Sequence, residues 1–146
     1  TLLWTADMLW VRPWGANNRW ILSGGVQGGD EKNPAHAAYL GGPGDLFHLA
    51  STPWRGERSA WLRLGVRRLL WESVLLGPIY GDLFVVRGAL FDEEWDEVAS
   101  PWEAGLALAV PGKMLGGRVL VVYDDEGNVT FGFELGSDFR RREIIP

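Results

Sequence analysis

The chain has 146 residues, a formal net charge of −5, 47% hydrophobic and 23% charged residues, and no cysteine. This composition fits one compact domain over residues 1–146 rather than two, and it excludes a disordered or fibrous chain. Because cysteine is absent, disulfide frameworks, thiolate zinc sites and cysteine nucleophiles are excluded as well.

The first half of the chain begins with a predicted hairpin, followed by a predicted loop and an ambiguous segment. Residues 8–14 and 19–22 flank Asn17-Asn18 and indicate two antiparallel strands, and the glycine-rich residues 23–36 are typical of a loop. Apolar side chains in residues 58–76 fall near helical spacing, whereas residues 61–66 alternate as in a strand. Gly65 disfavours an uninterrupted helix there.

The second half adds further strands and the clearest hairpin. Residues 82–91 and 106–110 are β-prone, and residues 92–105 are compatible with a short acidic helix or a loop. Residues 118–123 and 129–135, joined by the turn 124–128, form the hairpin. The sequence therefore predicts a mainly β fold, a single domain of antiparallel hairpins with at most one or two short helices, while an α+β fold stays possible.

Basic residues gather in the first half, where five arginines lie between residues 55 and 68. Guanidinium groups match phosphate and carboxylate oxygens, and tryptophans in turn-like contexts suit interfaces or stack on bases. Packing of such tryptophans in a core or turn is the alternative. We expect contact with RNA or a protein partner at these side chains: Arg55, Arg63, Arg67, Arg68, Trp54 and Trp102.

Acidic residues gather in the second half, where residues 92–103 hold six of them and no basic residue. A contiguous acidic run is usually solvated or faces a basic partner, and it seldom supplies a catalytic pair. The acidic positions that we expect to face a partner are Asp92, Glu93, Glu94, Asp96 and Glu97.

Signatures of catalysis are missing from the sequence. Gly112-Lys113 is followed by Met114, which breaks the phosphate-binding loop pattern, and no serine has the neighbours of a nucleophile elbow. The two histidines, His36 and His48, do not have metal-ligand spacing. We therefore expect no catalytic residue, no metal, no cofactor and no enzymatic activity.

The longest apolar stretches are far shorter than the ~20 residues of a membrane-spanning helix. The first nine residues also lack the basic and apolar regions of a secretory signal. The expectation from sequence is a cytoplasmic protein without membrane contact.

The order of segments supplies a family resemblance. The segments are Met8-Leu9-Trp10 with Arg19-Trp20-Ile21-Leu22-Ser23, then Tyr39-Leu40-Gly41-Gly42-Pro43-Gly44-Asp45-Leu46, Arg68-Leu69-Leu70-Trp71, Gly105-Leu106-Ala107-Leu108-Ala109-Val110-Pro111, Arg118-Val119-Leu120-Val121-Val122-Tyr123 and Asp124-Asp125-Glu126-Gly127-Asn128. This layout resembles the small Csx-type accessory subunit of type III-D CRISPR effector complexes. The segment 91–103 has no place in that pattern.

The resemblance implies a non-catalytic subunit that docks on the backbone subunits of an RNA-guided ribonucleoprotein and helps its assembly in antiviral defence. Its partners would be protein subunits, with guide or target RNA touched through the phosphate backbone. The residues leave two other hypotheses open. One is a small acidic immunity or inhibitor protein that binds a basic toxin or nuclease through residues 92–97; the other is an enzyme with His48 as base and Arg67 or Arg68 as anion clamp.

Overall fold

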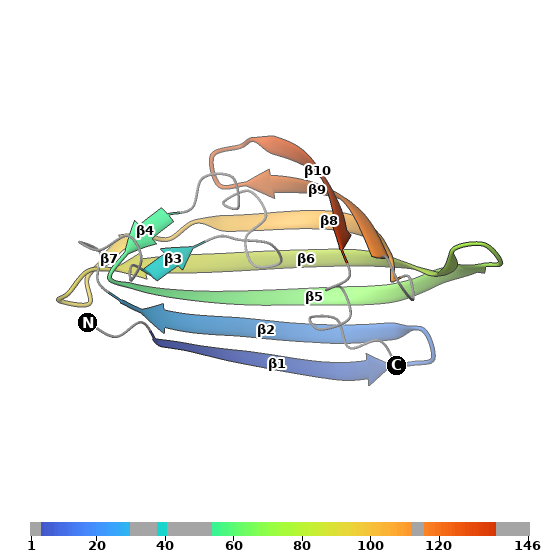
Figure 1. The fold of residues 1–146 in the computed structure, drawn as a ribbon, viewed down its shortest axis with the longest axis horizontal. Helices are drawn as coiled ribbons and strands as arrows, with labels where there is room; N and C mark the ends of the chain where they lie inside the picture. Colours follow the sequence, from blue (N-terminus) through green and yellow to red (C-terminus); the bar gives the residue numbers. More distant parts are fainter. Residues whose placement is uncertain (1–3, 30–37, 41–53, 112–115, 137–146) are drawn as a thin grey trace.

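The computed structural model describes residues 4–29, 38–40, 54–111 and 116–136. An eight-stranded antiparallel sheet dominates it, with the order β1-β2-β5-β6-β8-β9-β10 and with β7 paired to β6, while β3 and β4 form a separate two-stranded ribbon (Figure 1). The strands are β1 (Trp4–Trp14), β2 (Asn18–Gly28), β3 (Ala38–Leu40), β4 (Trp54–Gly56), β5 (Arg58–Ser73), β6 (Gly77–Phe91), β7 (Glu97–Ala99), β8 (Trp102–Val110), β9 (Gly116–Asp124) and β10 (Val129–Gly136).

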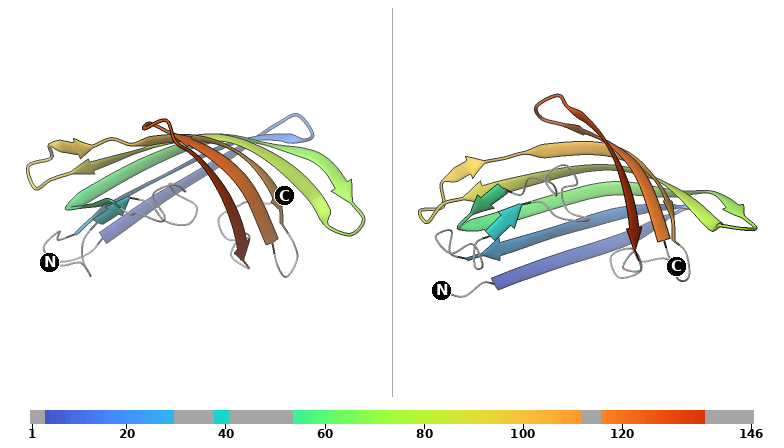
Figure 2. Two further views of the ribbon diagram at one scale, coloured as in Figure 1. Left: turned by 90° about the horizontal axis from the view of Figure 1, so that it is seen from above. Right: turned by 45° about the horizontal axis from the view of Figure 1, so that its top comes forward.

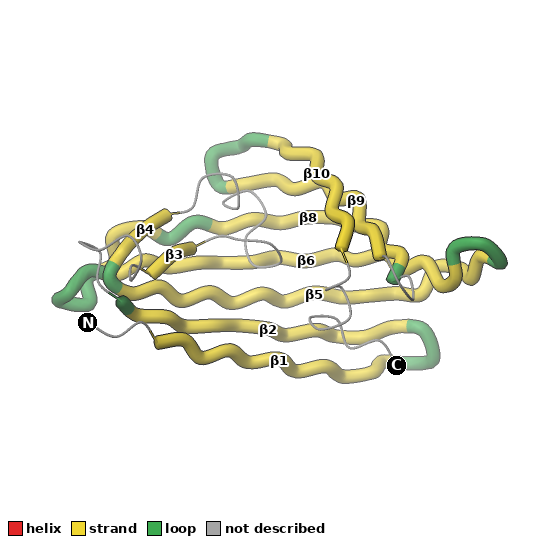
Figure 3. The backbone as a smooth tube through the Cα atoms, in the orientation of Figure 1, coloured by secondary structure: helices red, strands yellow, loops and turns green. Residues whose placement is uncertain are grey.

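The predicted mainly β class is confirmed, because the described residues contain strands and turns and no helix (Figure 3). Both predicted hairpins are present. Trp14 pairs with Asn18 where β1 turns into β2, and Tyr123 pairs with Val129 where β9 turns into β10. Gly15 and Gly127 adopt φ values of 70° and 85° in these two turns, the left-handed region that glycine tolerates.

The loop predicted for residues 23–36 begins too early, since β2 continues to Gly28. A Cβ at Gly25 would lie 2.5 Å from Asp7 Oδ1 and 2.6 Å from Trp61 Nε1. Glycine at this position therefore makes room for neighbouring side chains within the sheet, and it does not mark a turn. Residues 30–36, including His36, lie outside the described residues.

Residues 58–76 are not helical, and the two segments that follow also differ from the prediction. β5 is paired along one edge with β2 and along the other with β6, so the sheet decides the conformation that the side-chain spacing left open. The strands predicted for residues 82–91 and 106–110 are present but begin earlier, β6 at Gly77 and β8 at Trp102. The helix considered for residues 92–105 is wrong, because a turn, β7 and the start of β8 occupy them.

The sheet is arched, and the β3–β4 ribbon lies under the arch, on the concave face (Figure 2). Leu40 of β3 packs there against Val86 and Leu90 of β6. A second cluster on this face joins Phe84 to Leu120 and Val122. Both of these apolar clusters therefore lie on one side of the sheet.

Candidate functional site

The strand register separates the residues of the sheet into two faces. Residues directly opposite each other in an antiparallel pair project to the same face, and neighbours along a strand project to opposite faces. One row of opposed residues crosses the concave face as Gly65, Phe84, Gly105 and Val122. A neighbouring row crosses the convex face as Trp20, Val66, Leu83, Leu106, Val121 and Phe131.

The concave face holds the buried charges. The buried polar and charged side chains of the described residues all belong to it by register: Ser59, Arg67, Asp82, Glu103, Arg118 and Asp124. Burial of charge is costly unless the charge is paired. This covered face therefore holds charged groups beside the apolar clusters, and these ionic groups must be satisfied inside the protein.

Arg67 and Asp82 form the best-defined pair of this layer. Arg67 Nε donates to Asp82 Oδ1 at 2.7 Å, and Arg67 Nη2 donates to Asp82 Oδ2 at 2.6 Å. Their side chains are only 4% and 5% exposed, and the Arg67 guanidinium lies 5.5 Å from the centre of the Tyr80 ring. The pair is bidentate and largely removed from solvent, a geometry in which loss of either partner is strongly destabilising.

On the convex face, large apolar side chains are exposed. Leu106 lies on the inner strand β8 and Phe131 on the edge strand β10, and they are 61% and 77% exposed. The exposed large apolar side chains on this face are Trp4, Met8, Trp10, Trp14, Trp20, Val26, Leu62, Leu64, Leu70, Leu83, Val85, Trp102, Leu106, Leu108, Val119, Tyr123, Val129, Phe131, Phe133 and Leu135. We call this set the apolar band. Proteins that face only water rarely expose a continuous apolar patch of this extent.

Aromatic and cationic side chains border the apolar band at the strand ends. On β1, Trp4 and Trp14 occupy the first and last positions. On β5, Arg58 and Arg68 enclose the aliphatic residues between them. Beyond the border, the tip of the β5–β6 hairpin projects from the sheet (Figure 1), with Leu75 93% exposed and with Ser73 Oγ accepting hydrogen bonds from the N–H groups of Leu75 and Leu76.

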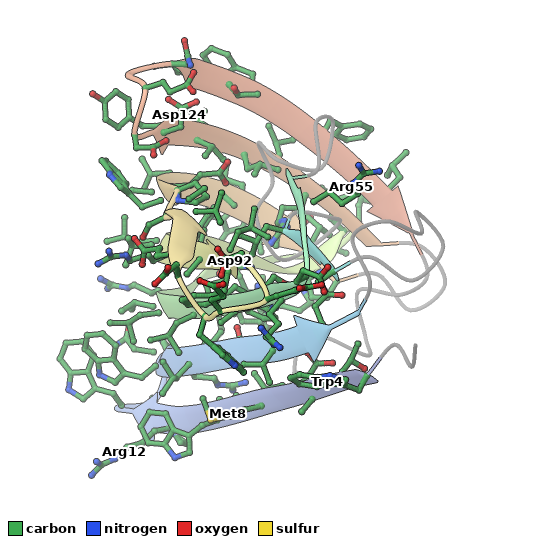
Figure 4. All side chains as sticks on the ribbon, turned by 90° about the vertical axis from the view of Figure 1, so that its left-hand side faces the viewer. Trp4, Met8, Arg12, Arg55, Asp92 and Asp124 are labelled. Carbon is green, nitrogen blue, oxygen red and sulfur yellow. The ribbon has the colours of Figure 1, made fainter. Side chains whose placement is uncertain are left out.

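The arginines expected to form one contact surface are divided between the faces. Arg67 is buried on the concave face, where Arg63 is half-buried with its guanidinium 4.3 Å from the Phe84 ring centre. Arg68 is exposed on the convex face, and Arg55 is exposed on β4, on the opposite side of the sheet from Arg12 (Figure 4). The described residues therefore do not unite this set into one patch.

The two tryptophans of the predicted contact set both lie in strands. Trp54 belongs to β4. Trp102 is the first residue of β8, so its predicted turn context is wrong. Its ring tilts against Tyr123 at 5.9 Å, at the border of the apolar band.

The acidic segment folds into a turn stabilised by its own side chains. Asp92 Oδ1 accepts hydrogen bonds from the N–H groups of Glu94 and Asp96, so the Asp92 carboxylate caps the turn. Trp95 has a φ of 69°, and the guanidinium of Arg58 lies 4.3 Å from its ring centre. The remaining acidic positions are exposed at the end of the sheet: Glu93, Glu94, Asp96 and Glu97.

Removing Arg58 is expected to loosen this turn. Arg58 Nη1 donates to the carbonyl oxygens of Asp92 and Glu93 at 2.6 and 2.9 Å. In Arg58→Ala, loss of these hydrogen bonds and of the Trp95 contact should accelerate amide exchange of Glu94 and Asp96 by about tenfold, corresponding to about 1.4 kcal/mol. Hydrogen exchange measures this, with Arg55→Ala as a matched surface control. Unchanged exchange in Arg58→Ala would show that the turn holds without the arginine.

A metal centre and a membrane-spanning helix each set requirements for the described ranges. Within these ranges, no three His, Asp or Glu side chains gather as metal ligands, and no helix has the length and apolarity to cross a membrane. A hollow of about 560 Å³ opens near Gly24, Ala60 and Ala89 on the convex face, with a mainly apolar lining. His48 lies outside the described residues, so its expected role as an alternative base stays a prediction.

No protein-family model, curated protein or solved structure matches this chain.

The apolar band is the feature that sequence reasoning missed. Its signal was present in β6 as the unbroken apolar run Leu83-Phe84-Val85-Val86, which places apolar side chains on both faces of the strand. Alternation divides a strand into two faces, but it does not state which face is covered. In a sheet that faces water, the face with the charged side chains is expected to be the exposed one. Here charged side chains such as Arg67 and Asp82 are buried.

Proposed function

We propose that this chain is a non-catalytic sheet module that lies in a lipid bilayer with its convex face against the acyl chains. The observation that supports it is that the charges of Arg67 and Asp82 are buried on one face, while the large apolar side chains of the other face, such as Leu106 and Phe131, are exposed. In water this arrangement leaves a large apolar surface without cover. In hydrocarbon the same surface is covered by apolar groups, which lowers its free energy relative to contact with water.

The composition of the apolar band favours lipid over a protein partner. Between the border residues, the convex positions of β8, β9 and β10 are Ala, Gly, Leu, Val and Phe only. A protein interface carries about one hydrogen bond per 100–200 Å² and contains polar groups that make them. Acyl chains offer no hydrogen-bonding groups, and the convex side chains of these three strands between the border residues need none.

The dimensions of the apolar band also fit a bilayer. Arg58 and Arg68 are ten positions apart on β5, which is about 33 Å at ~3.3 Å per residue. A tilted strand of about 9–11 residues crosses the ~30 Å hydrocarbon layer. Indole and guanidinium groups at both ends of this interval match the level of the lipid headgroups, where Trp, Tyr and Arg are favoured.

The proposal sets a condition on the edges of the sheet. No strand of the described ranges pairs with the outer edge of β1 or of β10. Unpaired backbone N–H and C=O groups cost several kcal/mol each in hydrocarbon. Lipid contact therefore requires that both edges pair with strands outside this sheet.

Flotation with vesicles tests the proposal. The chain, diluted from detergent into neutral phosphatidylcholine vesicles at 1 M NaCl, is expected to float with the lipid in a density gradient, because salt screens ionic adsorption but leaves apolar contact intact. A chain that stays monodisperse at the bottom of the gradient without detergent would overturn the proposal. The proposal departs from the sequence-based expectation of no membrane contact, and this experiment decides between them.

The accessory subunit of a type III-D CRISPR effector complex is the second candidate. The exposed apolar tip of the β5–β6 hairpin favours it, because Leu75 and Leu76 extend past the border arginines and offer contact to a partner protein. Co-purification with effector subunits, lost when Leu75 and Leu76 are replaced by serine, is the expected result for this candidate. A chain that floats with neutral vesicles and retains no effector subunit would exclude it.

A further inference from the structure

At one border of the apolar band, tryptophans and arginines of β1, β2 and β5 lie together on the convex face. Trp14 and Trp20 are stacked, with ring centres 6.1 Å apart and planes inclined by 25°. Arg12 is opposite Trp20 in the register of β1 and β2, and Asn18 is opposite both Trp14 and Arg68. Arg12 is therefore the cross-strand neighbour of Trp20, and Arg68 lies in the same row as Trp14, with Asn18 between them. We call Arg12, Trp14, Trp20 and Arg68 the rim cluster.

The charge of the rim cluster has no compensation within the described part of the chain. Neither Arg12 nor Arg68 makes a hydrogen bond or ion pair with another described residue, and both are exposed. The convex positions of β1, β2 and β5 as far as Arg68 include three arginines and no acidic residue. In contrast, Arg67, the immediate neighbour of Arg68, is buried against Asp82 on the other face.

We infer that the rim cluster binds the phosphate of an anionic lipid headgroup. This inference rests on the proposed function, and it adds the class of lipid and the residues that recognise it. Guanidinium forks bind phosphate oxygens in bidentate geometry, and indoles reside at the depth of the headgroups. The cluster is continuous with the apolar band through Trp10 and Leu22, so one lipid contacts both through its headgroup and its acyl chains.

The same residue types can bind single-stranded RNA by stacking bases on the indoles. Two observations favour lipid. The positions next to the cluster toward the strand centres, such as Leu22 and Val66, are apolar and offer nothing to a sugar-phosphate backbone. The chain as a whole has a net charge of −5, which disfavours non-specific binding of nucleic acid.

Vesicle binding by Arg12→Gln/Arg68→Gln tests the inference. Each arginine near an anionic surface contributes about 1 kcal/mol, so the double variant should bind vesicles containing phosphatidylglycerol roughly 30-fold more weakly than the wild type. Binding to neutral phosphatidylcholine should be unchanged. Arg55→Gln is the matched control, because Arg55 is exposed and lies with the β3–β4 ribbon on the other side of the sheet.

The outcomes separate the inference from the proposed function. Equal binding of the wild type to neutral and anionic vesicles overturns the headgroup site while lipid contact itself stands, and failure to bind either vesicle overturns the proposed function. Competition by millimolar inorganic phosphate would assign the cluster to a free anion. If single-stranded RNA competes with vesicles for the wild type, and the double variant no longer binds that RNA, the rim cluster would be assigned to RNA. Retention of anionic preference against both competitors supports the headgroup site.

Discussion

Asp82→Ala is expected to lower the free energy of unfolding by about 3–5 kcal/mol. The substitution takes from the buried Arg67 guanidinium the carboxylate that accepts two of its hydrogen bonds, at 2.7 and 2.6 Å. A cation left in a covered layer without this partner cannot recover its hydration. Urea unfolding in detergent micelles, followed by tryptophan fluorescence, measures the loss.

Two variants control this prediction. Ser100→Ala removes an acceptor from the exposed guanidinium of Arg87, at 3.1 and 3.0 Å, and should cost less than about 1 kcal/mol because water replaces the lost contact. Arg67→Met/Asp82→Leu removes both charges and should restore much of the stability lost in Asp82→Ala. A cost below about 1 kcal/mol for Asp82→Ala itself would show that the concave layer is hydrated.

Leu106→Arg is expected to have a large effect if lipid covers the convex face and a small effect if water covers it. If acyl chains cover the apolar band, a guanidinium at this central position should cost about 2–4 kcal/mol and should reduce vesicle association accordingly. If water covers it, the change at a side chain that is 61% exposed should stay within about 0.5 kcal/mol. Unfolding in lipid vesicles and flotation both report the difference.

Asp125→Arg is the matched control for Leu106→Arg. Asp125 is exposed in the turn between β9 and β10, so the added positive charge there faces water in either case. Flotation of Asp125→Arg should equal that of the wild type. Equal flotation of Leu106→Arg and the wild type would contradict lipid contact at the centre of the convex face.

Local patterns predicted the strands better than they predicted the faces. The hairpins around Asn17-Asn18 and residues 124–128 followed from alternation and turn residues, which are local properties. Gly24-Gly25 suggested a turn, yet at Gly25 the absent side chain makes room for Asp7 and Trp61, which lie on other strands. That requirement depends on the register of the sheet, and no local pattern contains it.

The candidate site was hidden for a related reason. Arg67 and Arg68 are adjacent in sequence, and a pattern of charge along the chain places them in one basic cluster. In a strand, neighbours point to opposite faces, so Arg67 is buried against Asp82 while Arg68 reaches the rim cluster. Which of the two faces meets solvent depends on what covers the sheet, and this information is not carried by alternation.

Nitroxide accessibility measures most directly what covers the convex face. The chain has no cysteine, so single substitutions give unique labels at Leu83→Cys, Leu106→Cys and Val121→Cys on one convex row, with Asp125→Cys as the turn control. In lipid vesicles the three convex labels should collide often with dissolved oxygen and rarely with a water-soluble nickel complex, and the turn label should show the reverse. Convex labels as accessible to nickel as the turn label, or shielded from both reagents, would contradict lipid contact.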